Sequence, residues 1–116
     1  MPRVNVRHFA SLRELLGNTR KEEYEVSDGT MLMNLLLEYI PKRHWNVSRS
    51  WKKRLFEMEE DGIKLNADGT PVLGFYSILI NGRECRSISE EGRRPGLRYE
   101  LRDGDVIAIL PPVGGG

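Results

Sequence analysis

The last six residues, 111–116, are the part of this chain whose residue types point most directly to chemistry. They read Pro-Pro-Val-Gly-Gly-Gly, so the chain ends in residues without side chains that would obstruct a narrow enzyme pocket. A carboxylate is a poor electrophile and must be activated before a thiol or an amine can attack it. We therefore predict that Gly116 carries the reactive carboxyl group, and that the residues before it thread that group into a partner: Pro111, Pro112, Val113, Gly114 and Gly115.

The two prolines bear on how this tail leaves the protein. Proline favours polyproline geometry, so we expect a stiff stalk at Pro111 and Pro112 that becomes flexible only at the glycines. Six extended residues span at most about 20 Å, at about 3.3 Å each. Glycine-rich ends can also be frayed termini or cloning scars. That alternative is disfavoured because the tail follows an apolar strand directly, without a polar linker.

The remaining residues with reactive side chains form no recognisable catalytic or metal-binding pattern. His8 and His44 have no carboxylate, cysteine or histidine at ligand spacing, which predicts a histidine at the edge of the core and one on the surface. Cys85 is the single cysteine and is interpreted as a small apolar filler, with a persulfide or thioester relay as the alternative. We predict no metal site and no bound cofactor.

Length and composition limit the class of protein. A chain of 116 residues supports one hydrophobic core. The net charge of +1, with acids and bases interspersed, disfavours direct nucleic-acid binding. No apolar run approaches the ~18 residues that span a membrane, and the N-terminus has no signal peptide core. Together with the lone cysteine, these features predict a cytoplasmic protein.

Hydrophobic periodicity outlines the elements that must position the tail. Residues 4–8 and 22–26 alternate like strands, with Tyr24 and Val26 inward, and residues 11–16 suit a short helix between them. Residues 32–40 carry leucines and other apolar side chains at helical spacing, and we expect Pro41 to end that helix. This order predicts an N-terminal hairpin followed by one main helix.

The second half of the chain reads as a variable segment followed by strands. A helix from Ser48 or Ser50 to about residue 60 would bring Trp51, Leu55 and Met58 onto one face. Residues 75–85 read as a hairpin turning at Asn81 and Gly82, and residues 97–101 alternate like a strand. Both tryptophans, at positions 45 and 51, are expected to pack the variable segment onto the domain.

The last strand, residues 106–110, is apolar on both faces, so one face should belong to the core and the other should dock a partner. Which face does which stays open at this stage. We name Ile107 and Ile109 as candidate docking residues, with Arg83 and Arg102 of the nearby arginine-rich region steering an acidic partner.

Three segments together resemble the MoaD/ThiS family of ubiquitin-like β-grasp proteins. These segments are VNVRHFASLRELLG near the start, ILINGR at 78–83, and LRDGDVIAIL followed by PPVGGG at the end. The resemblance covers roughly residues 2–40 and 76–116 and maps the family's terminal diglycine onto Gly115 and Gly116. It implies an α+β fold in which a mixed sheet of about five strands packs on one main helix. Residues 1–110 would form the domain, with a variable insertion at 41–75, and residues 111–116 the flexible tail.

The resemblance also implies a function. An E1-like activating enzyme would use ATP and magnesium to adenylate Gly116, which would then become a thiocarboxylate for molybdopterin (molybdenum cofactor) biosynthesis or tRNA thiolation. The chain would be a carrier and cosubstrate rather than an enzyme, and in the first case the small subunit bound to the large subunit of molybdopterin synthase. The alternatives are a protein modifier joined through Gly116 to substrate lysines, as in small archaeal modifier proteins, and a non-reactive β-grasp binding module.

Overall fold

A mixed five-stranded sheet forms the centre of the protein, in the order β2-β1-β7-β5-β6. The computed structural model describes residues 1–112. Strand β7 pairs in parallel with β1 and antiparallel with β5, while β2 and β6 form the two edges. This architecture confirms the predicted sheet of about five strands. The strands are β1 (Arg3–His8), β2 (Lys21–Glu25), β5 (Ser77–Ile80), β6 (Arg83–Glu84) and β7 (Val106–Leu110).

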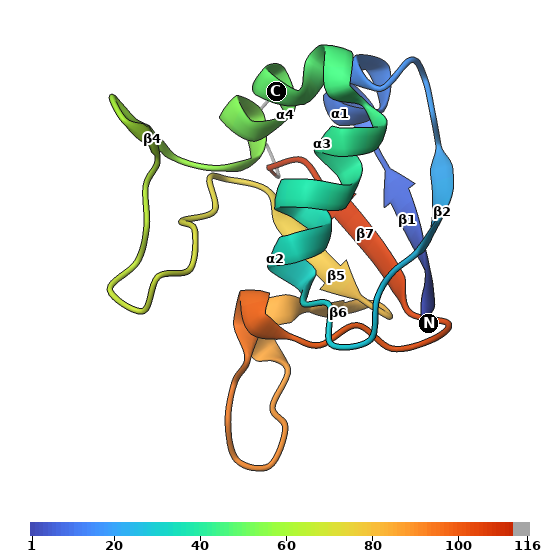
Figure 1. The fold of residues 1–116 in the computed structure, drawn as a ribbon, viewed down its shortest axis with the longest axis vertical. Helices are drawn as coiled ribbons and strands as arrows, with labels where there is room; N and C mark the ends of the chain where they lie inside the picture. The colour runs from blue at the N-terminus through green and yellow to red at the C-terminus, as the bar shows by residue number, and fades with distance from the viewer. Residues whose placement is uncertain (113–116) are drawn as a thin grey trace.

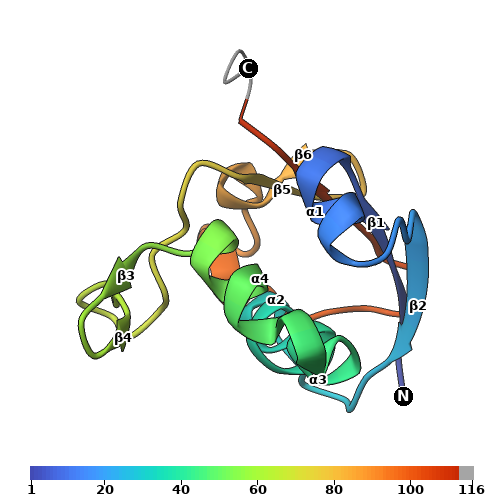
Figure 2. The ribbon, with the colours of Figure 1, turned by 90° about the horizontal axis from the view of Figure 1, so that it is seen from above.

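One face of the sheet is covered by helices (Figures 1 and 2). The main helical run comprises α2 (Leu32–Asn34), the π-helical segment η1 (Leu35–Tyr39) and α3 (Ile40–Arg43). The prediction that Pro41 ends this helix is wrong, because the run continues for one more turn beyond it. The preceding π-helical turn changes the hydrogen-bond spacing, so Pro41 starts a new α-helical turn, where its missing N–H is not needed.

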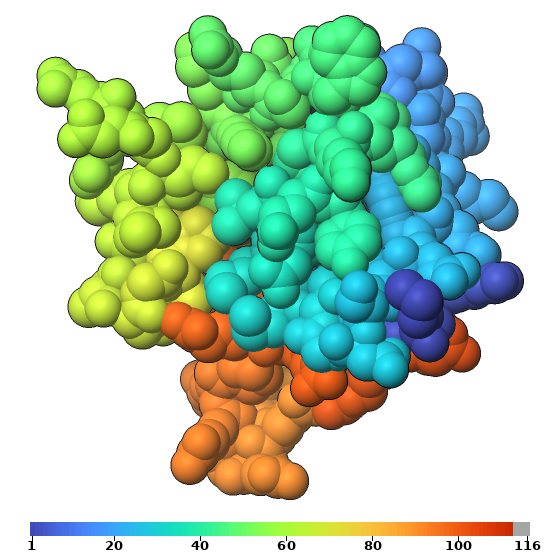
Figure 3. Space-filling model, in the orientation of Figure 1, coloured from blue at the N-terminus to red at the C-terminus, as the bar shows by residue number. Residues whose placement is uncertain are grey.

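The variable segment adds a second helix and a small hairpin. Helix α4 (Ser48–Leu55) follows the 3-10 turn η2 (Trp45–Val47) and buries Trp51 and Leu55. It ends earlier than predicted, and Met58 lies in the two-stranded hairpin of β3 (Met58–Glu59) and β4 (Gly62–Ile63). Because the helix is short, Lys52, Lys53 and Arg54 fall in its last turn, where the helix dipole favours cations. The hairpin and the loop around residues 87–95 project from the body (Figure 3).

The C-terminal half matches the expected turn but not one expected strand. Asn81 and Gly82, with φ of 52° and 83°, make the predicted two-residue turn between β5 and β6. Residues 97–101 are not a strand, since they contain the 3-10 turn η4 (Gly96–Arg98). Their alternating side chains at 97, 99 and 101 are nevertheless buried. Another 3-10 turn, η3 (Cys85–Ser87), follows β6.

The core lies between the sheet and the helices and includes part of the variable segment. Trp51 is fully buried and its indole N–H donates to the carbonyl of Leu36 at 2.9 Å, whereas Trp45 is 77% exposed. The prediction that both tryptophans pack is therefore right for Trp51 and wrong for Trp45. The short helix α1 (Ala10–Leu15) joins β1 to β2. Within residues 1–112, no helix combines the length and apolar character that crossing a membrane requires.

Candidate functional site: the central strand and the tail it carries

The tail leaves the domain from the central strand of the sheet. Strand β7 is hydrogen-bonded to a neighbour on each side, with Ile109 opposite His8 on β1 and Ile78 on β5. Its direction is thus fixed by two partners. Pro111, half-buried, and Pro112, exposed, follow the strand directly. The predicted reactive residue Gly116 and the threading residues Val113, Gly114 and Gly115 lie outside the described residues, so their roles stay predictions.

The turn before β7 is held by one buried carboxylate. Asp105 accepts hydrogen bonds from the Asn81 side chain at 2.9 Å, from the backbone N–H of Arg102 at 2.8 Å and from the Tyr99 hydroxyl at 3.1 Å. The Asn81 side chain in turn accepts from the N–H of Val106 at 2.8 Å. These bonds fix the start of the strand that carries the tail. Burial, followed by the adjacent Asp105 charge, raises the pKa of Tyr99.

One face of β7 is buried and the other is partly exposed, and the predicted docking residues lie on the buried face. Ile107 and Ile109 are fully buried under the helices, so the proposal that they contact a partner is wrong. The reason is strand alternation, which places them on the face shared with the buried Ile78 and Ile80. The outward face carries an apolar stripe of half-buried side chains, consisting of Leu79, Val106, Ala108 and Leu110.

Arg83 and Arg102 lie apart from this apolar stripe. Arg83 lies on the edge strand β6 opposite Ile80 of β5, so it belongs to the helix-covered face of the sheet. Arg102 forms an ion pair with Glu90 and stacks over the Tyr99 ring at 5.3 Å. Both arginines line a depression of about 260 Å³ beside the loop at residues 88–90. The structure thus brings the two arginines together without joining them to the strand face they were grouped with.

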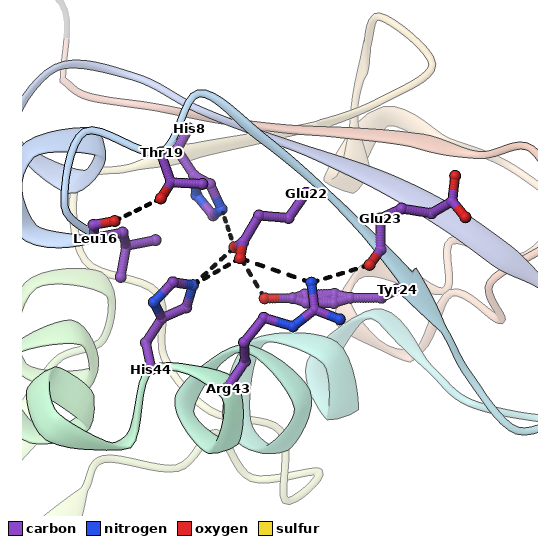
Figure 4. Close-up of polar contacts among 8 residues, drawn as sticks. All are labelled: His8, Leu16, Thr19, Glu22, Glu23, Tyr24, Arg43 and His44. Atoms are coloured by element: carbon purple, nitrogen blue, oxygen red, sulfur yellow. Dashed lines mark hydrogen bonds and ion pairs between the residues drawn. The ribbon is translucent and has the colours of Figure 1, made fainter.

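A cluster of polar side chains that the sequence reading missed lies between β1, β2 and α3 (Figure 4). At its centre is Glu22 of β2, whose side chain is only 10% exposed. Its carboxylate accepts hydrogen bonds from His8 Nε2 at 3.0 Å, His44 Nε2 at 2.9 Å and the Tyr24 hydroxyl at 3.0 Å. The guanidinium of Arg43 lies 3.6 Å away and also covers the Tyr24 ring. The cluster links the first strand pair to the end of the main helical run.

Two opposing effects set the charge state of Glu22. Burial on its own raises the pKa of this carboxyl, but hydrogen bonds from His8, His44 and Tyr24, together with the charge of His44, outweigh it and lower the pKa to about 2. The carboxylate in turn contributes, after burial, to raising the pKa of Tyr24. Glu22 is therefore ionised in the folded protein at neutral pH.

His8 completes the cluster in an unusual way. It is buried, its ring meets the Trp51 ring edge-on at 5.9 Å, and its Nδ1 has no hydrogen-bond partner within residues 1–112. When Nε2 donates to the Glu22 carboxylate, the other ring nitrogen, Nδ1, faces the core. The distances are those of hydrogen bonds, and no metal-holding group of three or more His, Cys, Asp or Glu residues is present in the described part of the chain.

The sequence showed no partner spacing for either histidine and predicted one at the edge of the core and one on the surface, whereas both side chains are largely buried and share the Glu22 carboxylate. The available signal was the alternation in β2, since a strand that places Tyr24 and Val26 inward also places Glu22 inward. The partner His8 lies on β1, and the contact depends on the register in which Arg7 faces Lys21 and Val6 faces Glu22. The contribution of His44 depends on the continuation of the helix past Pro41, which the sequence did not suggest.

Cys85 is fully buried, and burial raises the pKa of its thiol to about 11 with a smaller contribution from the Glu84 charge. A buried thiol with a raised pKa is a poor nucleophile at neutral pH. This environment supports the interpretation of Cys85 as an apolar filler.

The sheet order, the helices on one face and a tail continuing from the central strand define a ubiquitin-like β-grasp protein of the sulfur-carrier and modifier type. The sequence signature of the ThiS family matches residues 6–116, and the chain belongs to this family. The resemblance to the MoaD/ThiS proteins is thereby confirmed.

Individual relatives agree in fold and in length. The chain is 29% identical over 115 residues to small archaeal modifier protein 3 of Haloferax volcanii, covering 97% of this chain and 98% of that protein. It resembles the solution structure of small archaeal modifier protein 1 from Methanosarcina acetivorans, with a TM-score of 0.66, 29% identity and coverage of 100% and 98%. It also resembles a provisionally assigned molybdopterin converting factor subunit 1 from Pyrococcus furiosus, with a TM-score of 0.62, 30% identity and coverage of 97% and 100%.

Proposed function

We propose that this protein is a ubiquitin-like sulfur carrier that works through the terminal carboxyl group of Gly116. The observation that supports this proposal most is that the central strand β7, which pairs with a strand on each side, continues directly into a Pro-Pro stalk and terminal glycines. A domain held rigidly at β7 presents the chain end in one direction, and the prolines keep it clear of the sheet. The similarity to the provisionally assigned molybdopterin converting factor subunit 1 of Pyrococcus furiosus is consistent with this use.

The chemistry requires an activating partner. In the proposed sequence, an E1-like enzyme with ATP and magnesium transfers AMP to the Gly116 carboxylate and releases pyrophosphate. A hydrosulfide nucleophile then attacks the acyl carbon, the bond to AMP breaks, and a thiocarboxylate remains. Its sulfur is delivered to a molybdopterin precursor on the large synthase subunit or to a tRNA base. The glycines at 114–116 allow a close-fitting site to exclude water from the acyl adenylate.

The outward apolar stripe is the surface on which we propose that the activating enzyme docks. Leu79, Ala108 and Leu110 lie on one face of adjacent strands, and Leu110 directly precedes the Pro-Pro stalk. Contact there would hold the domain while the tail enters the adenylation site. The substitution Leu79→Lys is expected to raise the KM for adenylation at least tenfold without changing the unfolding midpoint. Ser50→Lys, on the exposed face of α4, is the matched control.

A second candidate function is conjugation to proteins, and the similarity to small archaeal modifier protein 3 favours it. Here a lysine ε-amine attacks the same acyl adenylate, AMP leaves, and an isopeptide bond forms. The two functions share activation and differ in the final nucleophile. A β-grasp binding module with an inert tail is the third alternative, and it predicts no activation.

Mass spectrometry of the protein isolated from its own cells separates these functions. A thiocarboxylate shifts the intact mass by the difference between sulfur and oxygen. Because the last basic residue is Arg102, trypsin leaves residues 103–116 as a branch on any modified lysine. Deleting Gly115 and Gly116 should abolish ATP-dependent activation and leave unfolding unchanged, while Ser50→Lys, on the exposed face of α4 and outside the tail, serves as the control. Activation that persists after the deletion would refute the proposed role of the tail.

A further inference from the structure

A basic pocket lies at the end of the sheet from which the tail departs. We use this name for the concave site of about 300 Å³ lined by Arg7, Phe9, Arg13, Arg20 and Lys21, together with His8. It is formed by the end of β1, helix α1 and the start of β2. Strand β1 runs parallel to β7 with His8 opposite Ile109, so the pocket lies beside the last residues of β7. Figure 2 shows α1 next to the point where the final strand ends.

The four cationic side chains of the basic pocket lack balancing acids. Within residues 1–112, none of them forms an ion pair or a side-chain hydrogen bond, and the other arginines and lysines supply all such contacts. The other end of the same strand pair differs, since Arg3 lies 3.9 Å from Glu23 and 3.6 Å from Glu25. The concentration of positive charge is local, because the net charge of the chain is only +1.

One contact in the basic pocket is unfavourable for folding. Arg7 on β1 and Lys21 on β2 are direct cross-strand partners, so their side chains emerge side by side on the same face. Like charges placed opposite one another destabilise a sheet. Nothing in the described residues compensates for this repulsion, whereas a bound anion would. The register thus presents two exposed cations side by side, an arrangement that suits an anionic ligand.

The composition of the basic pocket indicates the chemistry of that ligand. Three of its four cations are arginines, whose planar guanidinium groups bind phosphate oxygens through paired N–H donors. Phe9 is half-buried and adds an aromatic surface on which a base or sugar can pack. The site is concave and lies at the small end of the ~300–1,000 Å³ range of ligand pockets, which favours a compact group over a flat acidic protein surface.

We propose that the basic pocket binds a phosphate ester of a nucleotide, either as a free mononucleotide or as part of an RNA chain. The binding itself does not depend on Gly116. Its use does rest on the proposed function: six residues of tail span at most about 20 Å, so a phosphate-bearing acceptor held here would lie within reach of the chain end. The pocket would then select acceptors by their phosphate group.

The proposal is tested by NMR titration of the ¹⁵N-labelled full-length protein with AMP, with adenosine and with a short single-stranded RNA. AMP or RNA should produce saturable shifts in the amides of residues 7–9, 13, 20 and 21, while adenosine should not. The Arg7→Gln/Lys21→Gln variant should weaken binding about tenfold or more, since it removes two charge-assisted contacts. Arg49→Gln/Lys53→Gln is the matched control, because these exposed residues are i, i+4 neighbours on α4 and their loss removes the same charge.

Each result has a defined meaning. Saturation by AMP identifies a mononucleotide site, and tighter, strongly salt-dependent binding of RNA identifies an RNA site. Equal responses to AMP and adenosine, equal weakening in both double variants, or binding of an acidic peptide without any response to AMP or RNA would overturn the proposal. Urea unfolding should show that Arg7→Gln/Lys21→Gln is as stable as the parent or more so. If it does not fold, Arg13→Gln provides the same test, and the deletion of Gly115 and Gly116 should bind AMP normally.

Discussion

Replacing Glu22 by glutamine should destabilise the protein by an amount that depends on pH in a defined way. The substitution keeps the size of the side chain and removes the negative charge of the carboxylate, which accepts hydrogen bonds from His8, His44 and Tyr24. Folding lowers the pKa of this carboxyl from 4.5 to about 2. At about 1.4 kcal/mol per pKa unit, a difference of this size corresponds to roughly 3 kcal/mol of folding free energy.

The sign follows from the direction of the shift. The folded state binds the proton on Glu22 less tightly than the unfolded state does, so the stabilisation is complete above pH 4.5 and is lost as the pH falls toward 2. At pH 3 less than about half of it should remain. Urea unfolding of the parent and of Glu22→Gln between pH 6 and pH 2.5 measures this difference directly, because the contributions of all other carboxylates cancel to first order.

Glu23→Gln is the matched control for this experiment. Glu23 is the next residue on β2, its side chain is 58% exposed, and among the described residues its carboxylate contacts only Arg3, at 3.9 Å. Its replacement should change the unfolding free energy by no more than about 0.5 kcal/mol at any pH. If the two variants are equally stable, or if the effect of Glu22→Gln persists unchanged at pH 2.5, the cluster does not have the energetic role inferred here.

Further predictions concern the core, the turn and the thiol. Trp51→Ala should cost about 3–5 kcal/mol in a urea titration, whereas Trp45→Ala should cost less than about 0.5 kcal/mol, and similar values would contradict their different burial. Asp105→Ala should cost about 2–4 kcal/mol because three donors lose their acceptor, and hydrogen exchange should accelerate first in β7; uniform acceleration would argue against local anchoring. Cys85 should resist iodoacetamide at pH 7.5 until the protein is unfolded in urea, and rapid alkylation of the native protein would refute its burial.

Local patterns in the sequence were sufficient for much of the fold. Alternation identified β1 and β2, a continuous apolar run identified β7, and Asn-Gly identified the turn between β5 and β6, because these signals depend on residues close in the chain. Where the sequence reading was wrong, the deciding interaction lay elsewhere. Pro41 does not end its helix because a π-helical turn precedes it, and residues 97–101 alternate in burial without pairing as a strand.

For the candidate site, too, the sequence predicted the local features and missed those that depend on distant residues. The sequence alone placed an apolar strand ahead of Pro-Pro and terminal glycines, and its family signature follows from that order. It did not determine which face of β7 is buried, since both faces are apolar and only the position of the helices distinguishes Ile107 from Ala108. Nor did it show that Glu22 joins His8 to His44, or that Arg7 faces Lys21 beside the tail. Those pairings depend on strand register and helix length, which are set by packing across the whole core rather than by neighbouring residues.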